Sequence, residues 1–312
     1  MNLDDLLEEG IFFDPHYLPS MNSDHLPMTL CAMKGLGAND VQLQDFQGQY
    51  RQRLRPVSSN PLSGDWRGAV GNPDAYFGMM LYLRSEIDQR GIAEVVAEFL
   101  PEFVPGIALQ AFHPIIRLGY AIDFQSAAET SAGLAYLITS YREVPFDPQE
   151  IIDLESMLEH QAGNGPQQFR HERFSQRIIE LVSKDEFPTG TAPFAACAKS
   201  ALDIYRSTRD FFALHMVTAT QAARICAQLV DPQQVRSCLT GAILAAHKAV
   251  GSPSKGVFQP LSHSLEPEHS LKYAWACLSE FEAYGDPRYL EEVKALQEND
   301  LIPPWCAQAY NL

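Results

Sequence analysis

The sequence predicts an all-α protein, and two observations carry this prediction. Apolar residues recur at three- and four-residue spacing, and several such segments begin with a capping residue followed by proline, as in Asn72-Pro73, Asp231-Pro232 and Asp286-Pro287. No segment shows the alternation of Val, Ile or Thr that is typical of strands. We therefore expect one large multi-helix domain over residues 1–312.

In the first half of the chain, capping residues and apolar runs place the expected helices. Asn39-Asp40 is a good N-cap for a helix over residues 41–54, because Asn and Asp side chains accept hydrogen bonds from the free amides of a first turn. Similar reasoning predicts helices over residues 73–91, 106–124, 126–141 and 148–160.

The clearest break in the chain is Gly163-Asn164-Gly165-Pro166. It is the candidate boundary between two lobes, but histidines of interest lie on both sides of it, so a single domain is favoured. Beyond the break, we expect one or two helices over residues 194–230, then helices over 232–251 and 267–284, and a last one from 287.

Composition excludes some classes of partner. Of the 312 residues, 46% are apolar, and the net charge of −16 argues against binding to nucleic acid or to an anionic membrane surface. No apolar run reaches the ~18 residues of a membrane helix, and the acidic start lacks the basic flank of a secretion signal. We therefore expect a cytoplasmic location, while the oligomeric state stays open.

The cysteines give no sign of a metal site or of disulfides. They form no Cys-x-x-Cys pair, and most lie in segments expected to be helical, so we expect buried free thiols. They are Cys31, Cys197, Cys226, Cys238, Cys277 and Cys306.

Four histidines lie in apolar, helix-like segments far apart in the chain: His25, His113, His215 and His269. Neutral imidazole is the commonest nitrogen ligand for Zn, Fe, Cu or Ni, so we expect these histidines to line a buried metal or catalytic centre. Lys272 follows His269 by three residues and shares its helix face. Burial would lower its pKa, and the neutral amine could then coordinate, act as a base or form a carbamate with carbon dioxide. The alternative is that each histidine is an ordinary buried residue and that Lys272 is a surface lysine.

The remaining histidines lie in more polar surroundings, and we expect them at the surface. They are His16, His160, His171, His247 and His263, with His263 the exception nearest to the candidate ligands. A Glu-x-x-His sequence occurs at Glu266–His269, but di-iron bundles need two copies, and acidic residues at a helix start are explained by the helix dipole.

Two segments resemble the questin oxidase-like family closely. His25-Leu26-Pro27-Met28, followed by Gly35-Leu36-Gly37-Ala38, resembles the family's N-terminal signature, and Phe112 to Tyr120 resembles its second block. Leu214-His215 and His269-x-x-Lys272 are similar to its third and fourth blocks in spacing and order. One departure is Asp24, which stands where the family pattern has Asn before the histidine.

The resemblance implies an all-helical oxygenase that uses dioxygen on polycyclic aromatic polyketides such as anthraquinones. The implied reactions are Baeyer–Villiger-type oxygen insertion and oxidative ring cleavage. The implied centre is a non-haem iron held by four histidines and a carboxylated lysine, which correspond to His25, His113, His215, His269 and Lys272.

Three other residues are candidates for catalytic roles beside the iron or the substrate: Arg117, Tyr120 and Tyr273. A structural salt bridge is the alternative for Arg117. Two other functions remain open. One is an NADPH-dependent Baeyer–Villiger monooxygenase without metal, although Gly35-Leu36-Gly37 lacks the third glycine of a dinucleotide motif. The other is a non-catalytic helical binding protein.

Overall fold

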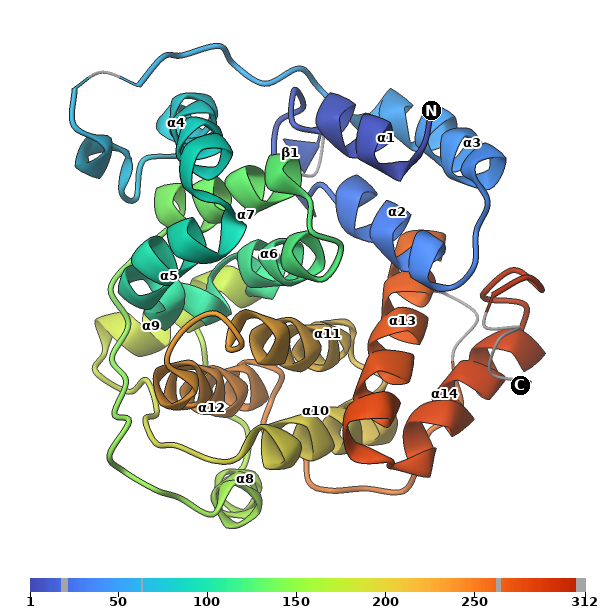
Figure 1. Ribbon diagram of the computed structural model, residues 1–312. Coiled ribbons are helices and arrows are strands. Elements are labelled where there is room, and N and C mark those ends of the chain that lie inside the picture. The colour runs from blue at the N-terminus through green and yellow to red at the C-terminus, as the bar shows by residue number, and fades with distance from the viewer. Residues whose placement is uncertain (18–21, 63, 262–264, 307–312) are drawn as a thin grey trace. The chain divides into compact units, whose positions relative to one another are not determined.

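The computed structural model describes residues 1–17, 22–62, 64–261 and 265–306. It is all-α, as predicted, apart from one antiparallel pairing of β1 (His16–Tyr17) with β2 (Asn22–Ser23) in the described residues (Figure 1). The sequence analysis expected no strand. Strands of two residues are too short to show an alternating pattern, which explains why this hairpin was missed.

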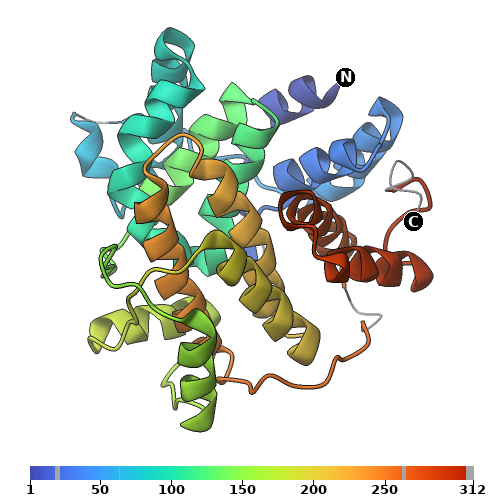
Figure 2. The same ribbon diagram turned by 60° about the horizontal axis from the view of Figure 1, so that its bottom comes forward.

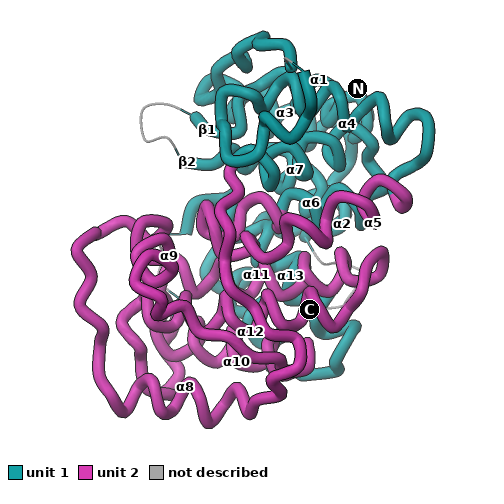
Figure 3. The backbone as a smooth tube through the Cα atoms, turned by 90° about the vertical axis from the view of Figure 1, so that its left-hand side faces the viewer, with its two compact units in different colours: residues 1–92, 117–139, 261–312 teal, residues 93–116, 140–260 magenta. Residues whose placement is uncertain are grey.

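The chain divides into two compact units, each made of separated segments (Figure 3). Unit 1 comprises residues 1–92, 117–139 and 261–312, and unit 2 comprises residues 93–116 and 140–260. The Gly163–Pro166 break lies inside unit 2, away from every boundary between the units. A single domain over the whole chain stays a prediction.

In unit 1, α4 packs against α7, and α13 packs against both α2 and α14. The contact between α2 and α13 is close, because a Cβ added at Gly35 would lie 2.5 Å from Cζ3 of Trp275. Glycine therefore lets the two helices approach. The helices of this unit are α1 (Leu3–Gly10), α2 (Leu26–Gly35), α3 (Asp40–Tyr50), α4 (Tyr76–Arg90), α7 (Ala127–Thr139), α13 (Pro267–Tyr284) and α14 (Pro287–Glu298), with short 3-10 turns η1 (Arg51–Arg53), η2 (Trp66–Ala69) and η3 (Pro73–Ala75).

In unit 2, α11 packs against both α10 and α12 (Figure 2). The backbones of α12 and the loop before α10 are in contact at Gly241, where a Cβ would lie 2.7 Å from the carbonyl oxygen of Pro188. The elements of this unit are α5 (Ile92–Phe103), the 3-10 segment η4 (Val104–Phe112), α8 (Leu154–Gly163), α9 (Phe174–Ser183), α10 (Phe194–Thr208), α11 (Phe211–Cys226) and α12 (Pro232–Ala249). Helix α6 (His113–Asp123) contains the boundary between residues 116 and 117.

The predicted helix starts at capping residues are mostly confirmed. The Asn39 side chain accepts from the amide of Gln42 at the start of α3, and Asp231 and Asp286 cap α12 and α14 in the same way. Gly91 ends α4, as expected. These starts depend on contacts within one turn, which is why the local sequence predicts them.

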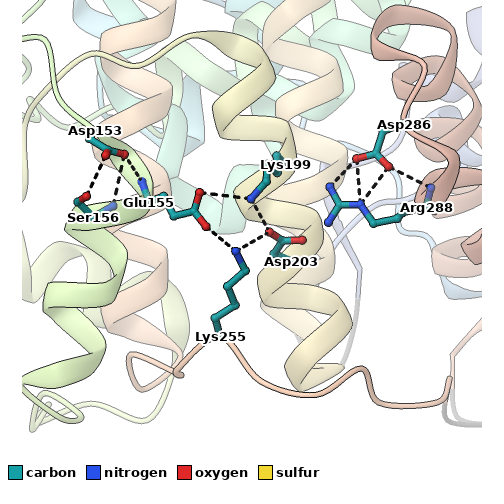
Figure 4. Close-up of polar contacts among 8 residues, drawn as sticks. All are labelled: Asp153, Glu155, Ser156, Lys199, Asp203, Lys255, Asp286 and Arg288. Atoms are coloured by element: carbon teal, nitrogen blue, oxygen red, sulfur yellow. Dashed lines mark hydrogen bonds and ion pairs between the residues drawn. The ribbon is translucent and has the colours of Figure 1, made fainter.

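One of the helices expected in unit 2 begins later in the structure. The helix expected from residue 148 begins only at Leu154, capped by Asp153 (Figure 4). The amide of Ile152 donates to the carbonyl of Thr191, and the backbone between residues 148 and 152 is not helical. The segment over 194–230, expected to form one or two helices, forms two, because Arg209 adopts a left-handed conformation and Asp210 caps α11.

The expectation for the cysteines is confirmed, since all six are buried and free. Within the described ranges, none of the helices has the length and apolar character needed to span a bilayer.

Candidate functional site

The structure brings the four candidate histidines together as two pairs, one in each unit. In unit 1, the ring centroids of His25 and His269 lie 4.5 Å apart. In unit 2, those of His113 and His215 lie 4.7 Å apart. All four side chains are buried, as the sequence analysis expected. One site built from all of them stays a prediction.

The pair in unit 2 presents ring nitrogens in a state suited to metal binding. Nδ1 of His113 lies 2.7 Å from the carbonyl oxygen of Gln110, and Nδ1 of His215 lies 2.8 Å from that of Phe211. A carbonyl oxygen only accepts hydrogen bonds, so each Nδ1 carries the proton. In the neutral ring, Nε2 then has a lone pair, and this Nδ1–H to carbonyl contact is common among metal-binding histidines.

The backbone directly before His113 is strained. Gln110, Ala111 and Phe112 have φ values of 51°, 52° and 66°, which is the left-handed region. A left-handed conformation costs roughly 1–2 kcal/mol for a residue with a Cβ, and such strain concentrates at functional sites. Here the turn brings the carbonyl of Gln110 to the ring of His113. The sequence analysis expected a continuous helix over this segment, and that expectation was wrong.

A cluster of phenylalanines surrounds His215. Phe174 and Phe212 are stacked with centroids 4.6 Å apart, and Phe112 lies 6.2 Å from Phe174. Phe211 lies 4.8 Å from the His215 ring, yet its side chain is 45% exposed. A half-exposed aromatic ring in contact with a buried histidine offers a surface on which a flat aromatic compound can stack.

Lys272 contacts His25, one of the pair in unit 1. His25 is the residue before α2, and His269 lies in the first turns of α13. Lys272 is 1% exposed, and its Nζ lies 2.7 Å from Nδ1 of His25. Burial lowers the pKa of Lys272 from an ordinary 10.5 to about 7, against the opposing charges of Glu268 and Asp24. The direction agrees with the expectation from the sequence, and a pKa of about 7 would leave a substantial neutral fraction of the amine near pH 7.

Two carboxylates and a guanidinium lie beside His269. Ligand atoms of Glu266, Glu268 and His269 all lie within 4.8 Å of one another. Nη1 of Arg53 donates to Oε1 of Glu268 at 2.7 Å, and Nη2 of Arg53 lies 3.7 Å from Oε2 of Glu266. The sequence analysis attributed these acidic residues to the helix dipole and missed their proximity to His269. The Glu-x-Glu-His sequence at residues 266–269 was the feature from which this proximity could have been predicted.

The other three predicted site residues make contacts within the protein. Arg117 donates to both carboxylate oxygens of Glu129, at 2.6 and 3.0 Å, in a buried ion pair. The hydroxyl of Tyr120 donates to the carbonyl of Lys272, at 3.2 Å. That of Tyr273 donates to Glu292, at 3.0 Å. The structural salt bridge considered for Arg117 is therefore present, and the catalytic roles of the three residues stay predictions.

One of the histidines expected at the surface is buried. His247 on α12 lies with Nδ1 2.8 Å from Oε1 of Gln161 and with Nε2 2.9 Å from the carbonyl of Pro253. The loop that follows α12 folds back over this ring. The polarity of the residues next to His247 in the sequence does not predict this contact. His160 and His171 are exposed, whereas His16 is only half-buried and His263 lies outside the described residues.

Unit 2 also contains a cavity of about 350 Å³ whose lining includes His247 but none of the predicted ligands. Ion pairs of Lys199 and Lys255 with Glu155 and Asp203 lie on its wall (Figure 4). These four charged groups are paired with one another, and none of the four candidate histidines lines the cavity.

Asp24, the departure from the family pattern, provides a pH-dependent prediction. Its carboxyl is buried, and this burial raises its pKa from 3.8 to about 6 despite the nearby charge of Arg117. The folded protein thus holds a proton that the unfolded chain loses between pH 4 and 6, so stability falls as the pH rises through that window. We expect Asp24→Asn to raise the free energy of unfolding of metal-free protein at pH 7.5 by up to about 3 kcal/mol.

Urea unfolding at pH 4 and pH 7.5 would check this prediction. The difference between Asp24→Asn and wild type should nearly vanish at pH 4, and the exposed Asp45→Asn should show little effect at either pH. If the free energies of unfolding of Asp24→Asn and wild type differ equally at pH 4 and pH 7.5, the pKa of Asp24 is not raised in the folded protein.

The comparisons with known proteins agree with the resemblance found in the sequence. The model of the questin oxidase-like family matches residues 22–196, more than half of the chain, which include His25 and His113. His215, His269 and Lys272 lie beyond the match. The chain is also 25% identical, over 131 residues, to Baeyer-Villiger oxidase ptaJ of Pestalotiopsis fici. That alignment covers 37% of this chain and only 30% of the relative. The extent of the family match shows that the chain belongs to the questin oxidase-like family.

Proposed function

We propose that this protein is an oxygenase that uses dioxygen to oxidise a flat, electron-rich aromatic compound of the polyketide class, such as an anthraquinone. The reaction would be Baeyer–Villiger-type oxygen insertion or ring cleavage. Membership of the questin oxidase-like family supports this proposal, as does the name of the fungal relative, which is matched over less than a third of its length. The phenylalanines around His215 suit such a substrate.

We further propose that the oxygenase depends on non-haem ferrous iron bound by His25, His113, His215, His269 and Lys272. The observation that carries this proposal is the pairing of the four buried histidines, with Nδ1 of both unit 2 rings bonded to carbonyl oxygens. The donor set fits a first-row metal, because neutral imidazoles are good ligands for iron. Bound iron would supply the redox chemistry that activates dioxygen toward the ring.

Lys272 has the chemistry to become a carboxylated lysine. Its neutral amine can attack the carbon of carbon dioxide, forming an N–C bond and releasing one proton to solvent. The resulting carbamate would place a negative charge among neutral imidazoles and favour a bound cation. Tyr120 would hold the backbone of Lys272 in place through its hydrogen bond to the Lys272 carbonyl.

The aromatic side chains near His215 would contact the substrate rather than the metal. Phe211, half-exposed beside His215, would stack on the substrate ring and exclude water from the face that reacts. Arg117 would stay fixed by Glu129 rather than bind the substrate.

Oxygen uptake tests the proposed activity. With ferrous iron and a hydroxylated anthraquinone, we expect consumption of dioxygen and a product that carries ¹⁸O from labelled gas. Ring cleavage that incorporates both oxygen atoms needs no reductant. Insertion of one oxygen atom needs two electrons from an added reductant such as ascorbate, and these reduce the second oxygen atom to water. Mass spectrometry of the product would distinguish insertion of one oxygen atom from ring cleavage. No uptake with a panel of anthraquinones and related phenols in iron-loaded protein would contradict the proposal.

A second candidate is an NADPH-dependent Baeyer–Villiger monooxygenase that needs no metal. The name of the fungal relative favours it. Against it, Gly35-Leu36-Gly37 forms the end of α2 and the turn that follows, rather than the start of a helix where a pyrophosphate would bind. Turnover by metal-free protein that requires NADPH would favour this alternative.

A further inference from the structure

We propose that the carboxylate of Glu268 is an additional ligand of the metal, beside His269 in unit 1, and that Arg53 positions it. This inference rests on the proposed metal-dependent function. It adds a protein carboxylate to a ligand set that otherwise contains imidazoles and Lys272.

The placement of Glu268 supports a role as a ligand. Its side chain is only 3% exposed, although it carries a charge and precedes His269 in the first turn of α13. Its carboxylate oxygen lies within 4.8 Å of a ring nitrogen of His269. Two ligands about 2.1 Å from one ion lie at most about 4.2 Å apart, so a small side-chain movement brings both atoms onto a metal.

The local charges favour a cation. Carboxylate oxygens of Glu266 and Glu268 lie within 4.8 Å of each other. Neighbouring carboxylates repel each other unless a proton or a cation lies near both. Arg53 contributes one positive charge to two carboxylates, and the adjacent histidines are neutral when they act as ligands. The two carboxylates and Arg53 together carry a net charge of −1, which attracts a cation.

Arg53 is held in place by aromatic residues and so fixes the carboxylate. Its guanidinium lies 4.6 Å from the ring centroid of Tyr17 and 4.8 Å from that of Tyr50. Its Nη2 also donates to the Tyr17 hydroxyl at 3.0 Å. A carboxylate has about four acceptor positions, so the bond from Arg53 leaves capacity for a metal. Hydrogen bonds of this kind commonly orient the ligands of metal sites.

The resulting donor set has a known chemical preference. His269 and Glu268 supply one imidazole and one carboxylate from one unit. Imidazole and carboxylate donors both bind first-row divalent metals such as iron and cobalt. The chemistry of these two side chains therefore fits the proposed metal.

Titration with Co(II) alone, followed by its visible absorption, tests Glu268 apart from activity. We expect Glu268→Gln to weaken Co(II) binding by about 100-fold or more and to change the spectrum. Glu266→Gln is the matched control, because Glu266 belongs to the same cluster but its side chain is 57% exposed. Glu266→Gln should change the affinity for Co(II) by less than about 3-fold. Arg53→Lys should weaken binding by about 10-fold, as expected for a residue that orients a ligand.

His269→Ala separates failure of this inference from failure of the proposed function. Loss of Co(II) binding in His269→Ala, with wild-type affinity and spectrum in Glu268→Gln, would overturn the role of Glu268 alone. Absence of Co(II) binding by the wild type would overturn both. If circular dichroism shows that Glu268→Gln does not fold, Glu268→Asp keeps the charge opposite Arg53 and shortens the side chain by one methylene. Unchanged affinity in that variant would also contradict the proposal.

Discussion

Replacing His215 with alanine is expected to remove bound iron from the protein while leaving most of its helical structure intact. The His215 ring is buried, and its Nδ1–H is bonded to the Phe211 carbonyl, which leaves Nε2 with the lone pair that binds a metal. Alanine has the highest helix propensity, so α11 should persist. Elemental analysis of protein purified without an affinity tag, together with far-ultraviolet circular dichroism, would measure both effects.

His247→Ala is the matched control for this variant. His247 is another buried histidine of unit 2, but both of its ring nitrogens lie within hydrogen-bond distance of Gln161 and Pro253. Its replacement should lower stability, since it leaves buried polar groups unsatisfied, but should not change the iron content. Iron retained in His215→Ala at the wild-type level would refute the assignment of His215 as a ligand.

Lys272→Met is expected to make the metal-free protein more stable and yet abolish iron binding and oxygenase activity. Burial lowers the pKa of Lys272 from 10.5 to about 7. The amine is protonated in the unfolded chain at pH 7, so folding must either remove this proton or bury the charge, and both cost free energy. Methionine removes this cost, which amounts to up to about 4 kcal/mol. It also removes the amine that would bind the metal or form the carbamate. Denaturant unfolding, iron content and oxygen uptake would measure the three effects.

The pH dependence has a definite sign. Between pH 7 and 10.5 the unfolded chain binds the lysine proton and the folded protein does not, so the wild type gains stability with rising pH relative to the variant. The advantage of Lys272→Met should therefore shrink toward pH 10. Lys294→Met, at a side chain that is 65% exposed in the same unit, should show none of these effects. Normal iron content in Lys272→Met would exclude Lys272 from the site.

The helices that begin at local caps were predictable from the sequence. Asn39, Asp231 and Asp286 each contact an amide within their own first turn, so the relevant residues are adjacent in the chain. The helix expected from residue 148 starts only at the local cap Asp153, and the contact of Ile152 with Thr191 just before this cap could not be predicted. Local propensity carries no information about such a partner.

The same distinction applies to the candidate site. The burial of four histidines and the low pKa of Lys272 followed from their apolar segments and from the cost of burying an ammonium group. The ion pair of Arg53 with Glu268 joins residues 215 positions apart and has no local pattern. The left-handed turn before His113 lacks glycine, the residue that normally marks such a conformation.

The metal content of the wild-type protein tests the central claim most directly. Protein purified without an affinity tag, and then incubated anaerobically with ferrous iron and desalted, should contain about one iron per chain. It should also consume dioxygen when an anthraquinone is added. Protein that retains no metal after this treatment would contradict the iron-dependent mechanism and would leave the NADPH-dependent reaction as the candidate function.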